Sequence, residues 1–245
     1  MRYSILFLFS TSAFFPITSY SQKVIPVQPG SVLMDGSFIE AYTNKWKVVV
    51  ENADGSSQDA LIWTDYAQLM NINGKKYLHR VQDLYSPSFN LVDSWINMVE
   101  HKTLKPWQFQ AVSSAGSVSF LEFLEKSIVS NSNRSQNSDM KMDTVDISNS
   151  LFDWNLYGML LVGLPFEIGS TYELSVWLPG ANQEGTVKAT MESKETISTL
   201  SNEKIETVKV STDKGLTFWL TKKAPYVIQL QLDQQNGARR MWYMF

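Results

Sequence analysis

The stretch SNSLFDWNLYGMLLVGLPFEIGS, residues 148–170, is the most apolar part of the chain outside its first twenty residues. Its apolar side chains recur on one face of a helix, at Leu151, Trp154, Tyr157 and Leu161. Ser150 followed by Asp153 resembles a capping box at the start, and Gly163 with Pro165 provides a stop. About eleven helical residues span roughly 16 Å, half the core of a bilayer. The stretch therefore predicts one short helix near 151–162, buried in the protein and too short to cross a membrane.

Alternation of apolar and polar residues dominates the sequence on both sides of this helix. The segments KWKVVVE (45–51) and TYELSVWL (171–178) each place one apolar row on one face of a strand. Asn73-Gly74 between two such runs is typical of a two-residue hairpin turn. About a dozen strands at this spacing favour an antiparallel meander, barrel or sandwich.

One long segment lacks both patterns. Residues 130–143, SNSNRSQNSDMKMD, are polar, rich in Ser and Asn, and contain no aromatic residue. Such a composition favours a loop over a strand or helix. We expect a mobile polar loop at about 130–146 inside a single antiparallel β domain that spans 22–245.

The first residues have the features of a secretory signal. Arg2 precedes an apolar run that ends near Ile17, and Ser19 and Ser21 provide the small-x-small pattern of a cleavage site. We expect a signal peptide over 1–21, cleaved after Ser21, no transmembrane segment in the mature chain, and a soluble protein exported to the bacterial periplasm or beyond.

Composition excludes several classes of function. The formal net charge is −3, which lacks the positive field that nucleic-acid binding needs. The chain has no cysteine, so it forms no disulfide and carries no lipid-modified cysteine. Aromatic residues make up 13% of the chain and eight of them are Trp, which predicts a large aromatic core or an aromatic-lined surface.

Catalytic patterns are weak. The chain has no G-x-S-x-G elbow, and its two histidines, His79 and His101, are expected on the solvated surface. Clustered metal ligands and glycine-rich phosphate loops are absent, so we expect no metal and no cofactor. Asp65, Asp93 and Glu122 lie near aromatic residues and keep open the alternative of a glycan hydrolase with paired carboxylates.

The excess of aromatic residues is the positive signal for binding. Trp177 and Trp219 fall on strand faces opposite the aliphatic rows of their own strands. Both faces of these strands therefore carry bulky apolar side chains that have to be shielded from water. Either the protein's own helix and loop cover them, or an apolar ligand does. The candidate ligand-binding residues are Trp154, Tyr157, Leu161, Trp177 and Trp219.

Three stretches resemble a bacterial family of exported proteins of unknown function. The first runs from Leu151 to Gly180 and contains an acidic residue, Asp153, that opens the helix, Tyr157, the Leu160–Leu161 pair, and FEIG ending at Gly169. The second is GLTFWLTKKAPYVIQLQL (215–232), and the third is VEHKTLKPWQFQ (99–110). An arginine that follows the helix in the family is replaced here by Val162-Gly163.

The resemblance implies a single, strongly curved antiparallel sheet, a half-open barrel wrapped around the helix, broadly similar to periplasmic lipoprotein carriers. A β-sandwich is the alternative. We expect a non-catalytic protein of the cell envelope that binds an apolar, lipid-like ligand or an envelope partner in the concave face. A glycan-acting hydrolase and a purely structural envelope component are the alternatives from other classes.

Overall fold

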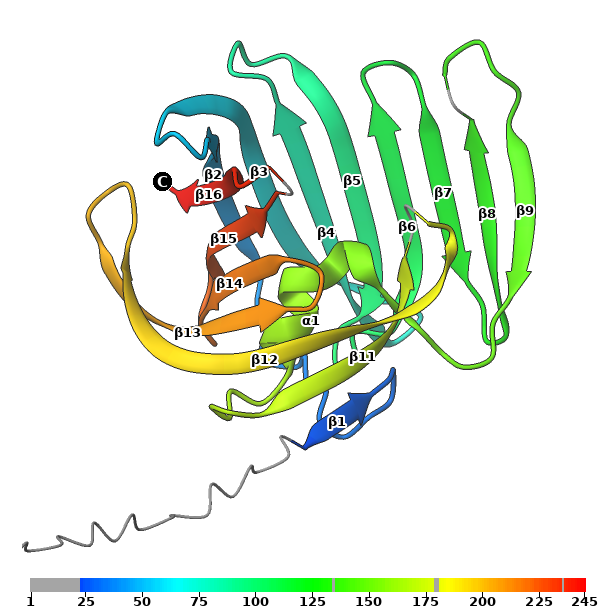
Figure 1. Ribbon diagram of the computed structural model, residues 1–245. Coiled ribbons are helices and arrows are strands. Elements are labelled where there is room, and N and C mark those ends of the chain that lie inside the picture. Colours follow the sequence, from blue (N-terminus) through cyan, green and yellow to red (C-terminus); the bar gives the residue numbers. More distant parts are fainter. Residues whose placement is uncertain (1–22, 134, 179–180, 235) are drawn as a thin grey trace, which may run out of the picture.

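The computed structural model describes residues 23–133, 135–178, 181–234 and 236–245. The expected signal peptide, residues 1–21, lies outside them. The described residues form one sheet of sixteen strands and one short helical segment (Figure 1). The prediction of a mainly β protein built on a single open sheet with one short helix is confirmed.

Nine strands precede the helix. They are β1 Val24–Val27, β2 Tyr42–Glu51, β3 Ser57–Ile72, β4 Lys75–Tyr85, β5 Leu91–Glu100, β6 Pro106–Ser113, β7 Val118–Phe123, β8 Ser127–Asn133 and β9 Lys141–Asp146. The helical segment and the later strands are β10 Phe152–Asp153, the 3-10 turn η1 Trp154–Leu156, α1 Tyr157–Gly163, β11 Thr171–Leu178, β12 Gln183–Ser198, β13 Lys204–Thr212, β14 Leu216–Leu220, β15 Val227–Asp233 and β16 Arg239–Met244.

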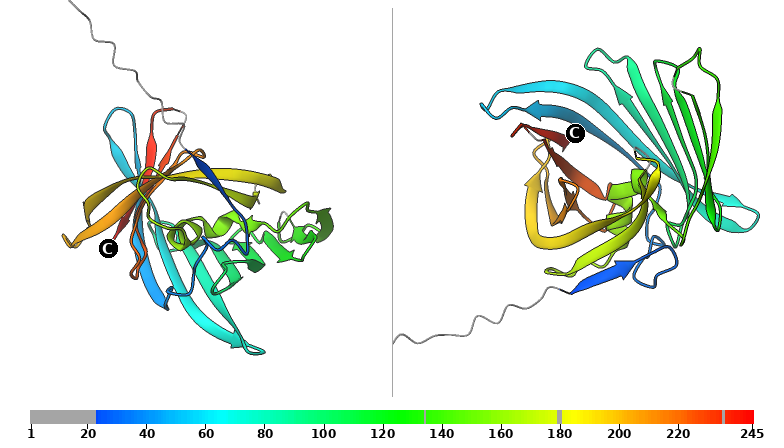
Figure 2. Two further views of the ribbon diagram at one scale, coloured as in Figure 1. Left: turned by 90° about the horizontal axis from the view of Figure 1, so that it is seen from below. Right: turned by 45° about the vertical axis from the view of Figure 1, so that its right-hand side comes forward.

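The sheet consists of two meanders joined by the last strand. The order is β1-β11-β12-β13-β14-β15-β16-β2-β3-β4-β5-β6-β7-β8-β9, and β10 also pairs with β11. The joint is the antiparallel pair of β16 and β2, where Met244 lies opposite Trp46 and Arg239 opposite Glu51. Strands β1 and β9 form the two ends, so the sheet curls around the helix without closing (Figure 2).

Two strand pairs depart from the antiparallel pattern. Both β1 and β10 run parallel to β11. The parallel pair of β10 and β11 follows from the helix between them, because a parallel pair needs a crossover that carries the chain back to the starting end. The helix is therefore the crossover between its flanking strands as well as part of the core.

The helical segment starts three residues later than the sequence predicts. Phe152 and Asp153 pair with β11, and the helical turns begin at Trp154. Asp153 is itself the N-cap, because its carboxylate accepts a hydrogen bond from the backbone N–H of Asn155. The expected capping box with Ser150 is thus wrong, since the acidic residue is the cap rather than its partner.

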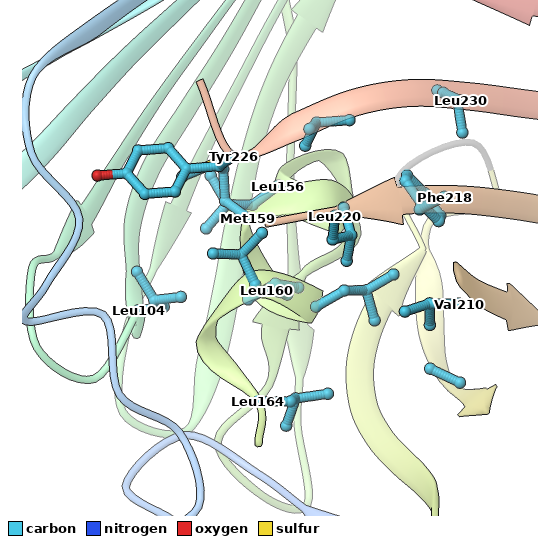
Figure 3. Packing of buried hydrophobic residues seen from close by; sticks show 14 of the residues in the cluster. Leu104, Leu156, Met159, Leu160, Leu164, Val210, Phe218, Leu220, Tyr226 and Leu230 are labelled. Carbon is cyan, nitrogen blue, oxygen red and sulfur yellow. The ribbon is translucent and has the colours of Figure 1, made fainter. Parts of the chain in front are cut away.

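Helix α1 lies in the concave face of the sheet. Six of its seven residues are buried. Figure 3 shows Met159 and Leu160 of α1 among Phe218 and Leu220 of β14. A Cβ at Gly158 would come within 2.8 Å of Val227 Cγ2, so this glycine permits the close approach of α1 to β15.

The segment expected to be a polar loop is mostly sheet. Residues 127–133 and 141–146 are strands β8 and β9, so the predicted loop over 130–146 is wrong for these residues. The polar composition predicted a loop wrongly, because a hairpin at the edge of a sheet needs an apolar row only where it meets the core. Ile128 and Ile147 provide that row, in a second cluster that also holds Trp177 of β11.

Candidate functional site

The concave face contains an open groove of about 470 Å³ beside the helix. Seven elements contribute to its wall: β3, β4, β5, the helical segment and β14 to β16, with one residue from the turn before β14. The lining residues are Leu61, Trp63, Leu84, Val92, Asp93, Trp95, Trp154, Tyr157, Lys214, Leu216, Leu230, Leu232, Arg240 and Trp242. Most of these side chains are apolar, and the ionisable groups besides Tyr157 are one carboxylate and two cations.

Aromatic rings form the floor of this groove. Trp63 of β3 packs edge-on against Trp95 of β5 with 5.4 Å between ring centroids, and against Trp242 of β16 with 5.8 Å. On the helical side, the rings of Trp154 and Tyr157 lie 5.9 Å apart. Edge-on packing fixes these rings in place, so the groove has a preformed aromatic wall.

A smaller cavity continues from the inner end of the groove. Its volume is about 20 Å³, enough for one or two water-sized groups. It shares with the groove Trp63, Tyr157, Leu230 and Trp242, and it is further lined by Trp46, Arg80, Gln82, Gly158 and Val227. The groove therefore leads to a small inner cavity whose wall is mainly apolar and also includes Arg80 and Gln82.

Arg80, which lines the inner cavity, belongs to a buried ion pair. Arg80 of β4 is 2% exposed and Asp65 of β3 is 1% exposed. Arg80 Nη2 lies 2.6 Å from Asp65 Oδ2, and Arg80 Nε donates to Oδ1 at 3.0 Å. Tyr42 also donates its hydroxyl hydrogen to Asp65, at 3.2 Å from Oδ2. Two charges are tolerated here because each is held by the other and by further hydrogen bonds.

Burial also changes the acid–base properties of the groove. It raises the pKa of Tyr157 to about 12, so this phenol is neutral near pH 7. It raises the pKa of Asp93 above its usual range as well.

The structure brings together two of the five residues expected to bind a ligand. Trp154 and Tyr157 both line the groove. Leu161 is fully buried in the main core, and Trp177 is fully buried in the second cluster with Phe109 and Leu121. Trp219 is outside the groove, and its indole N–H donates to Glu195 at 2.7 Å. The protein's own side chains thus cover Trp177, and a neighbouring glutamate pairs with Trp219.

Sequence reasoning missed the aromatic floor of the groove. Trp63, Trp95 and Trp242 lie in β3, β5 and β16, where apolar residues follow one another directly, so alternation does not say which face each ring occupies. Their meeting depends on the pairing of β16 with β2, which brings the end of the chain next to its beginning.

Neither histidine is fully exposed in the structure. His101 is 7% exposed, with its ring Nε2 2.7 Å from the Ile39 carbonyl, so its expected place on the solvated surface is wrong. That contact fixes the loop before β6. His79 is half-buried, and burial lowers its pKa. Across the described residues no group of three or more His, Asp or Glu is placed to hold a metal ion.

The candidate carboxylates for hydrolysis are dispersed. Asp65 is held in the ion pair with Arg80, Asp93 lines the groove, and Glu122 lies on β7, two strands beyond β5. Among the described residues that line the groove, Asp93 is the one carboxylate. Glycoside hydrolysis needs two carboxyl groups on either side of the scissile bond, and the groove does not provide that pair.

A second recess of about 430 Å³ does carry two glutamates, Glu195 of β12 and Glu206 of β13. The hydrogen bond from the Trp219 indole lowers the pKa of Glu195. A carboxyl group with a lowered pKa is ionised near pH 7, so Glu195 is a poor general acid.

An open, curled sheet around one buried helix, with an aromatic groove in its concave face, describes the class of fold. The chain belongs to the DUF3108 family, proteins of unknown function, whose model matches residues 64–241. The resemblance drawn from the residues around the helix is confirmed at this level. Neither the family nor the fold assigns an activity.

The similarity of this chain to a solved structure is distant. No curated protein matches the chain. Among solved structures, the chain is similar to one described as a "putative lipoprotein from Parabacteroides distasonis ATCC 8503", with 9% identity, 87% of this chain and 98% of that chain covered, and a TM-score of 0.37. A likeness this distant carries no weight for function.

Proposed function

We propose that this protein is exported to the cell envelope and binds an apolar, lipid-like ligand in the groove of its concave face. The groove itself carries the proposal. Its volume of about 470 Å³ lies within the 300–1,000 Å³ typical of small-molecule sites, and its wall is mainly aliphatic and aromatic. The features of a signal peptide at residues 1–21 support export.

The energetics suit a hydrocarbon chain. Each methylene removed from water contributes about 0.8 kcal/mol, so a chain of about ten methylenes can offset the cost of association.

The groove also has charged lining residues, which are Arg240, Lys214 and Asp93. Among the described residues no helix is long and apolar enough to cross a membrane.

Two other functions fit the structure less well. An envelope partner that inserts an apolar segment would use the same groove, but nothing specific to a protein segment favours it. Hydrolysis of a glycan in the groove is disfavoured because Asp93 is the one carboxylate among the described residues that line it.

Binding of N-phenyl-1-naphthylamine, an uncharged apolar probe, to the delipidated full chain tests the proposal. We expect a saturable rise in probe fluorescence, and about tenfold weaker binding for Trp95→Ala, which removes part of the groove wall. The matched control is Trp107→Ala. Trp107 is half-buried and packs against Tyr77 outside the groove, so its loss should leave the dissociation constant unchanged. No saturable binding, or equal effects of both variants, would refute the proposal.

A further inference from the structure

Three buried N–H donors at the inner end of the groove have no hydrogen-bond partner among the described residues. They are Trp46 Nε1, Arg80 Nη1 and Trp242 Nε1. All three side chains line the inner cavity of about 20 Å³. Buried donors in folded proteins are nearly always paired, so three in one small cavity call for an acceptor.

The two acceptors next to the Arg80 guanidinium, Asp65 and Gln82, are already engaged. Asp65 accepts from Arg80 Nε, from Arg80 Nη2 and from the Tyr42 hydroxyl. The Gln82 amide oxygen, in the orientation that satisfies its neighbours, accepts from Arg80 Nη2 at 3.0 Å and from Trp63 Nε1 at 3.2 Å. The inner cavity therefore presents three unused donors, more than the Tyr157 hydroxyl can pair, so an occupant that brings an acceptor would satisfy them.

The chemistry of the cavity restricts what that acceptor can be. The positive charge of Arg80 is already neutralised by Asp65, so a carboxylate would bring an unpaired negative charge into a buried site. A hydroxyl group would bring an O–H donor of its own into a cavity that has spare donors. A water molecule has the same defect twice over, because it brings two O–H donors. A carbonyl oxygen accepts and donates nothing, and one such atom fits the volume.

Resting on the proposed function, we propose that the ligand is an acyl ester or amide. Its uncharged carbonyl oxygen enters the inner cavity and accepts from the indole and guanidinium N–H groups, while its hydrocarbon chain lies along the aromatic groove. Trp63, Tyr157, Leu230 and Trp242 line both spaces, so one molecule can occupy the two at once.

A series of probes of similar length tests this on the delipidated full chain, by displacement of N-phenyl-1-naphthylamine. The series is methyl dodecanoate, tetradecane, dodecanol and, at pH 8, dodecanoate. We expect methyl dodecanoate to bind about tenfold more tightly than each of the other three. Trp242→Phe, which removes one donor and part of the groove wall, should weaken binding of the ester several-fold more than binding of tetradecane.

The matched control is Trp95→Phe, because Trp95 lines the groove but not the inner cavity. It should weaken the ester and the hydrocarbon equally. Equal affinities for methyl dodecanoate and tetradecane would overturn the carbonyl inference and leave the groove as an apolar site. Tighter binding of dodecanoate or dodecanol would overturn it as well. Failure of every probe to bind would refute the proposed function and this inference together.

Discussion

Arg80 and Asp65, on neighbouring strands β4 and β3, form an ion pair that is almost completely shielded from water, with 2.6 Å between Arg80 Nη2 and Asp65 Oδ2. The pair lies where the apolar groove ends, so it supports both the core and the polar end of the candidate site. Its effect on stability and its effect on binding can be separated by mutation.

Replacing one member of the pair alone should be costly. Arg80→Met leaves Asp65 buried without its charge partner, and we expect a loss of about 3–5 kcal/mol in the free energy of unfolding. The double variant Arg80→Met with Asp65→Leu removes both charges and should recover most of that loss. Urea denaturation measures each value. A double variant no more stable than the single one would contradict this view of the pair.

The pH dependence of stability should report on Asp153. Burial raises the pKa of this carboxyl from 3.8 to about 7 in the folded protein. Between these pH values the folded state holds a proton that the unfolded state has released, so stability contributed by this group falls as pH rises from about 4 to about 7. Above pH 7 the loss is complete and constant.

Asp153→Asn should remove this part of the pH dependence. The Asn97 side chain donates to Asp153 Oδ2 at 2.8 Å, and Asn97 Oδ1 has no partner among the described residues. Rotation of the Asn97 amide would therefore let it accept from the new side chain. Thermal denaturation from pH 4 to pH 8 gives the comparison, and equal slopes for the two proteins would show that Asp153 does not titrate in this range.

The C-terminal end of α1 depends on Lys222, whose ammonium group donates to the carbonyls of Val162 and Leu164. The same group lies over the rings of Phe38 and Phe166, at 4.8 and 4.3 Å from the centroids. Lys222→Met should cost about 1 kcal/mol of stability, because it removes the cap and both cation–π contacts.

Lys223→Met is the matched control for Lys222, since Lys223 is an exposed neighbour on the same loop. Its free energy of unfolding should stay within about 0.5 kcal/mol of the wild type. If both variants lose the same stability, the loss comes from the charge of the loop and not from the helix cap.

The close packing of α1 against β15 should make Gly158 intolerant of a side chain. Gly158→Ala places a Cβ 2.8 Å from Val227 Cγ2, and we expect a loss of about 1–3 kcal/mol. Adding Val227→Ala removes the clashing atom, so the double variant should lose less than the sum of the two single changes. A double-mutant cycle by urea denaturation measures this coupling, and strict additivity would argue against the contact.

Local features of the fold could be predicted from the sequence because their causes are local. Asn73 and Gly74 both have positive φ, 51° and 81°, as the expected hairpin turn requires. In β2 the alternation from Tyr42 to Val48 matches the alternation of buried and exposed side chains. The apolar run that follows Asp153 forms the buried helix.

The pairing of distant strands could not be predicted in the same way. Strands β16 and β2 pair along their length, and nothing in either segment identifies the other as its partner. The polar hairpin of β8 and β9 lacks the alternation that identifies strands elsewhere, because β9 is mostly exposed and β8 is mostly half-buried. The groove requires both the local sequence patterns and the pairing of distant strands, because seven elements form its walls.

The central claim, that the groove holds a lipid-like molecule, is tested most directly by native mass spectrometry of the mature protein isolated gently from its own cells. We predict a discrete added mass equal to one acyl lipid, much reduced in Trp95→Ala and retained in Trp107→Ala. A spectrum that shows only the bare polypeptide in every preparation would contradict the claim.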